Sequence, residues 1–241
     1  MKAKILLTAI ICFLLTGCTR YPDETKKALR EFSKENRKKF EAVLKHYKAP
    51  EDSLKYKAAC FMIENMKGNG AYKGKQLSDF NAIFDVLANK PPDYRENLPW
   101  YSDELTQLFD SIENIYGRLS YANMYFVKDE DTFTEESFIT YIEESFRSWD
   151  NPWSRKIVSF NDFLNYVLPY RSFKELLEPW REMFMDKFKW IYDSITPNED
   201  IINVARKLNI GSELKYSNGF GRYIVPIAPS DLLKAMYGNC T

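Results

Sequence analysis

The spacing of apolar side chains between about residues 24 and 198 constrains the fold of this chain more than any other feature. Apolar residues recur three or four positions apart in a charged background, as they do on one face of an amphipathic helix. The first examples are Leu29, Phe32, Phe40, Val43, Leu44 and Tyr47. Because 45% of the residues are apolar and 16% aromatic, such faces can bury a sizeable core. The pattern predicts a mainly α fold with a multi-helix domain at residues 28–197.

Proline and glycine divide this region into separate helices. Pro50 ends the first helix, Gly68 and Gly70 lie in a break after the second, and a Pro-Pro pair follows the third. The predicted helices cover residues 54–66, 77–88, 102–117, 132–149, 159–167 and 173–195. Pro179 falls inside the last of these, so we expect a break or a kink there.

The pattern changes after Pro197. One more helix is expected at residues 198–208, and glycines then separate short segments rich in β-formers. These segments lie at residues 214–216 and 222–225. A last helix is expected to begin at Ser230 or Asp231 and to end at Gly238. We therefore predict a boundary near residue 197, followed at 198–241 by an incomplete α+β segment that is less well packed at 230–241 than the helical domain.

The first 17 residues have the features of a secretory signal peptide. Lys2 and Lys4 precede an almost unbroken apolar run at residues 5–15, and small residues follow. This run is shorter than the roughly 20 apolar residues of a membrane-spanning helix. The stretch Leu15-Thr16-Gly17-Cys18 resembles the bacterial lipobox. The resemblance implies that Cys18 becomes the new N-terminus and carries acyl chains; the alternative is an ordinary secretory signal.

A lipid on Cys18 would anchor the chain, since each buried CH2 group contributes about 0.8 kcal/mol. Residues 18–27 are polar and lack apolar periodicity, so we expect them to form a tether. The expected location is the bacterial cell envelope, on the outer membrane.

The charge balance argues against a nucleic-acid partner. The chain has 34 basic and 34 acidic residues, and removal of Lys2 and Lys4 with the signal leaves 32 basic residues. A nearly neutral chain lacks the basic patch that nucleic-acid binding requires. The only histidine, His46, lies in a Lys-rich segment and is expected on the surface, so we predict no metal site and no cofactor.

Four cysteines do not make a disulfide framework here. Cys12 lies in the signal and Cys18 is the lipidation site, which leaves Cys60 and Cys240. An exported chain permits a bridge between these two, but the sequence does not require one.

Other polar and aromatic groups have two interpretations. The five tryptophans are compatible with a sugar-stacking platform, but in an aromatic-rich helical domain we expect them in the core. They lie at Trp100, Trp149, Trp153, Trp180 and Trp190. The acidic run at 129–131 is expected in a solvated loop. Glu143 and Glu144 are expected to face water, because adjacent residues on a helix do not share a face.

Cys240 is the candidate nucleophile. Gly238 can end one helix and Asn239 can cap the next, which would place Cys240 in a first helical turn. The partial positive charge at a helix N-terminus lowers the pKa of a thiol, as a cysteine nucleophile requires.

Several blocks resemble transglutaminase-like lipoproteins of Bacteroides-type bacteria, over most of the chain that follows the signal. The Leu-Pro-Tyr-Arg and Trp-Arg blocks are the most specific. The matching blocks are Ala58 to Met66, Asn151-Pro152-Trp153, Phe160 to Phe163, Tyr166 to Arg171, Glu178 to Arg181, and Gly238-Asn239-Cys240.

The resemblance implies a helical region ahead of a papain-like core. It also implies that Cys240 is a nucleophile that attacks peptide amides, with a downstream histidine as base and an aspartate orienting it. No residue follows Thr241, and His46 precedes the cysteine. We therefore expect the chain as given, a natural truncation or a part of a longer protein, to lack amide hydrolysis and acyl transfer.

Two functions thus remain open. One is the N-terminal part of a transglutaminase-like envelope lipoprotein with a peptide or protein substrate. The other is a non-enzymatic helical lipoprotein that binds a protein or glycan partner at the cell envelope.

Overall fold

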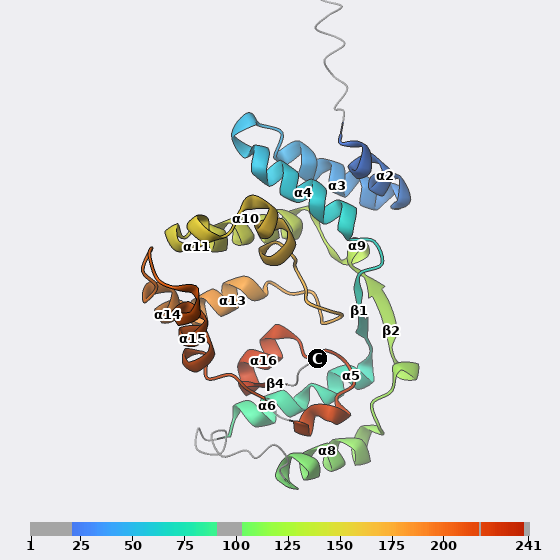
Figure 1. The fold of residues 1–241 in the computed structure, drawn as a ribbon. Coiled ribbons are helices and arrows are strands. Elements are labelled where there is room, and N and C mark those ends of the chain that lie inside the picture. Colours follow the sequence, from blue (N-terminus) through green and yellow to red (C-terminus); the bar gives the residue numbers. More distant parts are fainter. Residues whose placement is uncertain (1–20, 91–102, 217, 239–241) are drawn as a thin grey trace, which may run out of the picture.

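The computed structural model describes residues 21–90, 103–216 and 218–238 (Figure 1). Helices make up most of this part of the chain, and its strands form two small two-stranded sheets. The prediction of a mainly α fold is confirmed, whereas the papain-like character of residues 198–241 stays a prediction. No helix in the described ranges is long and apolar enough to cross a membrane.

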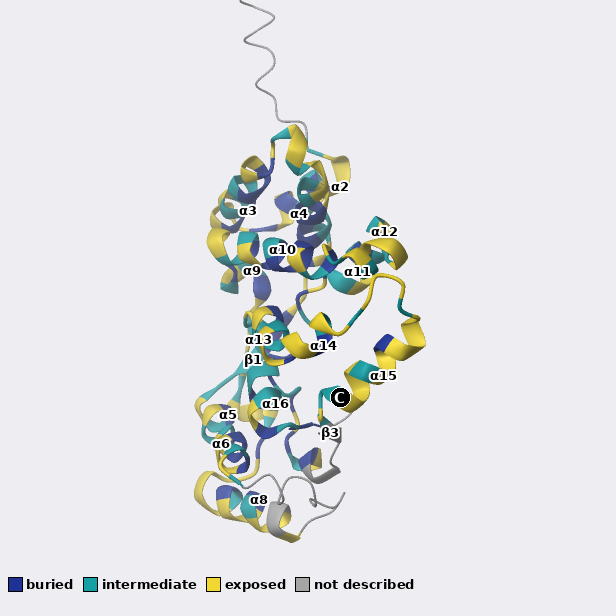
Figure 2. Cartoon of the chain, turned by 90° about the vertical axis from the view of Figure 1, so that its left-hand side faces the viewer, coloured by how far each residue is buried: buried dark blue, intermediate teal, exposed yellow. Residues whose placement is uncertain are grey.

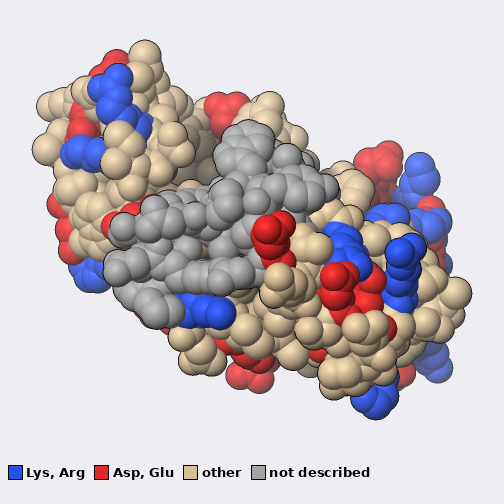
Figure 3. Space-filling view, turned by 90° about the horizontal axis from the view of Figure 1, so that it is seen from below, with Lys and Arg blue, Asp and Glu red and all other residues tan. Residues whose placement is uncertain are grey.

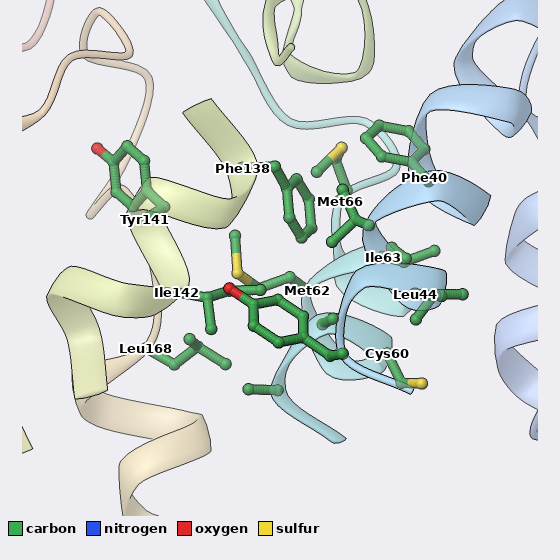
Figure 4. Packing of buried hydrophobic residues seen from close by; sticks show 14 of the residues in the cluster. Phe40, Leu44, Cys60, Met62, Ile63, Met66, Phe138, Tyr141, Ile142 and Leu168 are labelled. Carbon is green, nitrogen blue, oxygen red and sulfur yellow. The ribbon is translucent and has the colours of Figure 1, made fainter. Parts of the chain in front are cut away.

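The first hydrophobic core joins helices from two distant parts of the sequence (Figure 4). Phe40, Ile63 and Phe138 are fully buried at its centre. The helices around it are α2 (Asp23–Glu31), α3 (Lys34–His46), α4 (Ser53–Asn65), α10 (Glu135–Trp149) and α12 (Phe160–Asp162), which runs into the π-helix η4 (Phe163–Val167). The short elements η2 (Pro50–Asp52), α9 (Asp129–Thr132) and α11 (Pro152–Ile157) connect them.

The second hydrophobic core also draws on two separate stretches of chain. Phe84 stacks on Phe220, and Tyr223 meets Phe84 edge to face. Its elements are α5 (Lys75–Phe80), α6 (Ala82–Ala88), α8 (Asp103–Tyr116), η5 (Asn218–Arg222) and α16 (Pro229–Ala235). The strands β3 (Lys215–Tyr216) and β4 (Tyr237–Gly238) pair in parallel beside it.

An antiparallel ribbon of two strands lies along one side of the molecule and connects the regions of the two cores (Figure 1). It consists of β1 (Gly70–Lys73) and β2 (Tyr125–Lys128), and η3 (Tyr121–Asn123) precedes β2. A Cβ atom at Gly70 would lie 2.5 Å from the ring of Phe126, so glycine makes room for that ring.

Three helices lie between or beside the two cores: α13 (Trp180–Lys187), α14 (Lys189–Asp193) and α15 (Ile201–Gly211). Helix α13 contacts both α10 and α16. Helix α15 stands at the outside, with only Val204 buried (Figure 2).

Several predicted boundaries differ from those in the structure. Helix α2 begins at Asp23 and buries Thr25, so residues 23–27 are not tether. No helix covers residues 173–179; the predicted long helix is the pair α13 and α14, which begins after Pro179. Residues 222–225 form no strand, and β3 pairs instead with β4.

The boundary near residue 197 does not separate the two cores. Helices α5, α6 and α8 precede it, yet they pack with residues 220–237. Residues 230–241 were expected to be less well packed than the helical domain. Helix α16 instead packs on α6, and Asp231, Ala235 and Tyr237 are buried. The expectation is therefore wrong as far as Gly238.

Candidate functional site

The two cysteines with predicted roles, Cys18 and Cys240, lie outside the described residues. The structure does describe the chain that leads to Cys240. Helix α16 ends at Ala235, Met236 takes a left-handed conformation with φ of 60°, and Gly238 is buried in β4. The prediction that Gly238 ends this helix is therefore wrong, because the helix ends at its C-cap residue, Met236.

A group of polar side chains lies next to this segment and joins α6 to α16. Tyr223 donates a hydrogen bond to Asn81 (2.6 Å), and Asn81 donates to Asp231 (3.3 Å). Burial raises the pKa of Asp231, and Lys234 opposes this effect. Glu178 accepts hydrogen bonds from the Ser230 amide (2.5 Å) and hydroxyl (2.9 Å) at the start of α16. The polar groups of this set are hydrogen-bonded to one another, so the set has a structural role.

The acidic run at 129–131 is not a solvated loop. Asp129 is 1% exposed and lies 2.5 Å from Arg171, whose side chain is 5% exposed. Burial raises the pKa of Asp129, and the Arg171 guanidinium opposes this effect. Arg171 also donates to Gly70 O (3.2 Å) and to Glu175 O. The pair thus fixes the loop after Pro169 against the start of the ribbon.

The sequence suggested that Glu143 and Glu144 both face water, and this is wrong for Glu144. Glu143 accepts hydrogen bonds from Lys55 (2.7 Å) and Tyr47 (3.0 Å). Glu144 is 5% exposed, and its Oε2 has no hydrogen-bond partner among the described residues. Burial raises its pKa, and the nearby charge of Glu182 adds to that effect.

Arg181 is a second buried cation. It stacks on Trp180 at 4.5 Å and donates to Pro169 O (2.7 Å) and Val167 O. Burial lowers its pKa to about 10, so it remains charged at neutral pH. These contacts connect α13 to the end of η4, which gives Arg181 a structural role.

The remaining predictions from single residue types have mixed outcomes. His46 is exposed, as expected, and Cys60 is a buried free thiol in α4. Of the tryptophans, Trp149 is buried and Trp153 and Trp180 are half-buried, whereas Trp190 is 58% exposed and Trp100 lies outside the described residues. They form no shared platform where described, because Trp149 packs on Phe163 inside the first core.

Two grooves flank the end of α10, with volumes of about 350 and 380 Å³. Arg147 and Asp150 line both. Most other charges there already pair with each other, as in Lys55–Glu143 and Lys189–Asp193. This leaves little uncompensated charge in the grooves for a ligand.

A cluster of partly exposed aromatic side chains lies at the ribbon. Tyr72 packs edge-on against Tyr121 (4.7 Å) and Phe126 (5.4 Å), and the ammonium group of Lys174 lies about 6 Å from the Tyr72 and Phe126 rings. Tyr121 and Phe126 are 47% and 39% exposed. Tyr121 donates a hydrogen bond to Ile224 O (2.6 Å), which holds its ring in place. We call Tyr72, Tyr121, Phe126 and Lys174 the ribbon face.

Sequence reasoning missed the ribbon face. Residues 125–128 read Tyr-Phe-Val-Lys, a run of β-formers that the helical pattern on either side obscured. The contact between residues 72 and 126 is long-range, so spacing along the chain could not reveal it.

Charges elsewhere are mixed. The face seen from below carries basic and acidic side chains interspersed with uncharged surface (Figure 3). Within the described ranges, no group of three or more His, Cys, Asp or Glu side chains could hold a metal ion.

A comparison with protein-family models, curated proteins and solved structures finds no match to this chain.

Proposed function

We propose that this protein is a lipid-anchored component of the bacterial cell envelope that binds a partner there through the ribbon face. The observation that carries the proposal is the exposure of Phe126 on β2 and of Tyr121 in η3, both packed against Tyr72 on β1. Large aromatic side chains exposed together usually mark a binding surface. Tyrosine suits this role because it adds a polar group to a rigid apolar ring.

The contacts around the ribbon support a preformed surface. Arg171 fixes one end of β1, and the hydrogen bond of Tyr121 to Ile224 fixes the ring that precedes β2. A surface that is ordered before binding loses less conformational entropy when the partner arrives.

The binding proposal is tested by sedimentation with envelope fragments of the cells that make the protein, and every protein compared carries Cys18→Ala so that a lipid anchor cannot itself cause sedimentation. We expect the Tyr121→Ala, Phe126→Ser double variant to lose most of the co-sedimentation that the protein with an intact ribbon face shows. The matched control is Ile115→Ser with Tyr116→Ala, which removes two exposed apolar side chains from α8. Equal sedimentation of all three proteins would refute the ribbon face as the binding surface.

The anchor is tested separately. Cys18→Ala is expected to abolish labelling with radioactive palmitate and to release the protein from a membrane pellet washed with high salt, which weakens ionic contacts with a partner but does not extract a lipid anchor. Cys12→Ala, within the same signal, is the control and should leave both unchanged. Membrane retention and labelling of the Cys18→Ala variant would contradict the anchor.

A second candidate function is the cysteine chemistry that the family resemblance implies. The segment Gly238-Asn239-Cys240 carries that resemblance. A nucleophilic Cys240 should react with iodoacetamide well below the pH at which an ordinary thiol does. Free cysteine in solution serves as the reference, because the Cys60 thiol is buried and its pKa is raised by burial. An ordinary pH profile for Cys240 would remove this candidate.

A further inference from the structure

We propose that the ribbon binds an extended, acidic segment of polypeptide, which adds to the outer edge of β2 as a third strand. This inference rests on the proposed binding function and names the chemistry of the partner. Three observations carry it: the hydrogen-bonding pattern of the ribbon, the side chains beside its open edge, and the charge around it.

The hydrogen-bonding pattern follows from one contact at the end of the ribbon. The Asp129 amide donates to Asn69 O (3.0 Å), and the next pair in register is Gly70 with Lys128. Hydrogen-bonded and non-hydrogen-bonded pairs alternate along antiparallel strands. The pair of Tyr72 with Phe126 is therefore non-hydrogen-bonded, and the backbone N–H and C=O groups of Phe126 point away from β1.

The two edges of the ribbon differ in what already occupies them. On β1, Gly70 O accepts a hydrogen bond from Arg171. On β2, Lys128 O accepts one from Thr132 (3.0 Å), but no described residue bonds to the backbone of Phe126. An unpaired edge of this kind is a template for an incoming strand.

The side chains along this edge define what the added strand should carry. Phe126 and Lys128 are two residues apart, so they lie on the same face of the ribbon. An incoming strand would place an apolar side chain beside Phe126 and an acidic one beside Lys128. The partner segment should thus contain an acidic and an apolar residue separated by one position.

The charge around the edge favours an acidic partner. Lys174 lies over the rings of the ribbon face, and it has no carboxylate partner among the described residues. Lys128 forms a long ion pair with Glu130 (3.7 Å), and its side chain is 58% exposed, so its ammonium group stays accessible to a partner. Of the nearby carboxylates, Asp129 is buried and paired with Arg171, and Glu175 is buried and accepts hydrogen bonds from the Ser172 and Phe173 amides. Neither forms an ion pair with Lys128 or Lys174.

The inference is tested with the full chain in detergent micelles and a display library of short random peptides. We expect enriched peptides to share the acidic-x-apolar pattern. Their synthetic versions should lose binding when alternate amides on one side of the strand are N-methylated, and should keep it when the other set is methylated. Lys128→Glu and Lys174→Glu should each weaken binding by about tenfold or more, equivalent to 1.4 kcal/mol. Lys45→Glu, exposed on α3, is the matched control and should bind as the unaltered chain does.

The outcomes separate this inference from the proposed function. Peptides that require Phe126 for binding, but still bind after either set of amides is N-methylated, would refute strand addition. The ribbon face would then remain a binding surface. Failure to enrich any peptide, together with competition by envelope glycan fragments for co-sedimentation, would assign the ribbon to glycans and refute this inference. Enriched peptides that bind equally to the Tyr121→Ala, Phe126→Ser variant would refute both.

Discussion

At the scale of single residues, the buried charges decide most of the behaviour that can be tested. Four charged residues have side chains that are almost completely buried: Arg171, Arg181, Asp129 and Glu144. A buried charge is tolerated only when neighbouring groups compensate for the loss of water. These four differ in how far that compensation goes, and the differences give two predictions.

Arg171→Met should destabilise the protein by about 3–5 kcal/mol, because it leaves Asp129 buried without its partner. Chemical denaturation measures this free energy. Adding Asp129→Asn should recover part of the loss, since the amide is neutral. Lys189→Met removes a cation from an exposed pair with Asp193 and should cost at most about 1 kcal/mol. Similar losses for Arg171→Met and Lys189→Met would contradict a buried ion pair.

Glu144→Gln should stabilise the protein at neutral pH and lose this advantage in acid. The pKa of Glu144 is raised in the folded state, so the folded protein binds the proton more tightly than the unfolded chain does. The wild type therefore loses stability as pH rises through the raised pKa, whereas glutamine stays neutral throughout. Thermal melting from about pH 4 to pH 8, spanning the ordinary glutamate value near 4.3, measures the difference in Tm. Glu136→Gln, exposed on the same helix, is the control and should show no such pH-dependent gain.

At the scale of elements, α10 contributes to the first core and contacts α13. Its start is fixed by reciprocal hydrogen bonds: the Ser137 amide donates to the Thr134 hydroxyl (3.0 Å), and the Thr134 amide donates to the Ser137 hydroxyl (2.9 Å). The sequence places the start of this helix three residues early because Phe133 fits the apolar spacing. The capping pair, rather than the apolar pattern, sets the first residue.

Thr134→Ala should destabilise the protein by about 1 kcal/mol through loss of this cap. Thr140→Ala is the same substitution at an exposed position in the interior of α10. It should not lower the free energy of unfolding, because alanine has the higher helix propensity. Urea denaturation of both variants measures the two effects. Equal stability of the two would show that the cap contributes little.

At the scale of the whole molecule, two buried cores are each assembled from distant segments, and the ribbon and α13 connect them. The chain passes from the first core to the second at β1, returns at β2, and reaches the second core again at η5. The segments therefore cannot be divided at one position along the sequence.

Phe220→Ala should destabilise the second core by about 3–5 kcal/mol, since Phe220 is fully buried against Phe84 and Phe109. Hydrogen exchange should then quicken in α5, α6 and α16 before it does in α3, α4 and α10. Uniform quickening across both cores would show instead that they unfold as one unit. Phe138→Ala in the first core is the reciprocal variant and should reverse the order.

The sequence alone determined the helical class and most helix positions, because apolar spacing and the N-caps act over only a few residues. Helix α4 at Ser53–Asn65 and α8 at Asp103–Tyr116 agree with prediction to within a few residues. Only the tertiary structure decided which helices share a core, which acidic residues are buried, and that residues 72 and 126 form one surface. These features depend on contacts between residues tens of positions apart, and the free energy of such contacts comes from burial that no local pattern records. Asp129 shows the difference: it looks like a solvated acid in the sequence, and its burial follows from Arg171, 42 residues later.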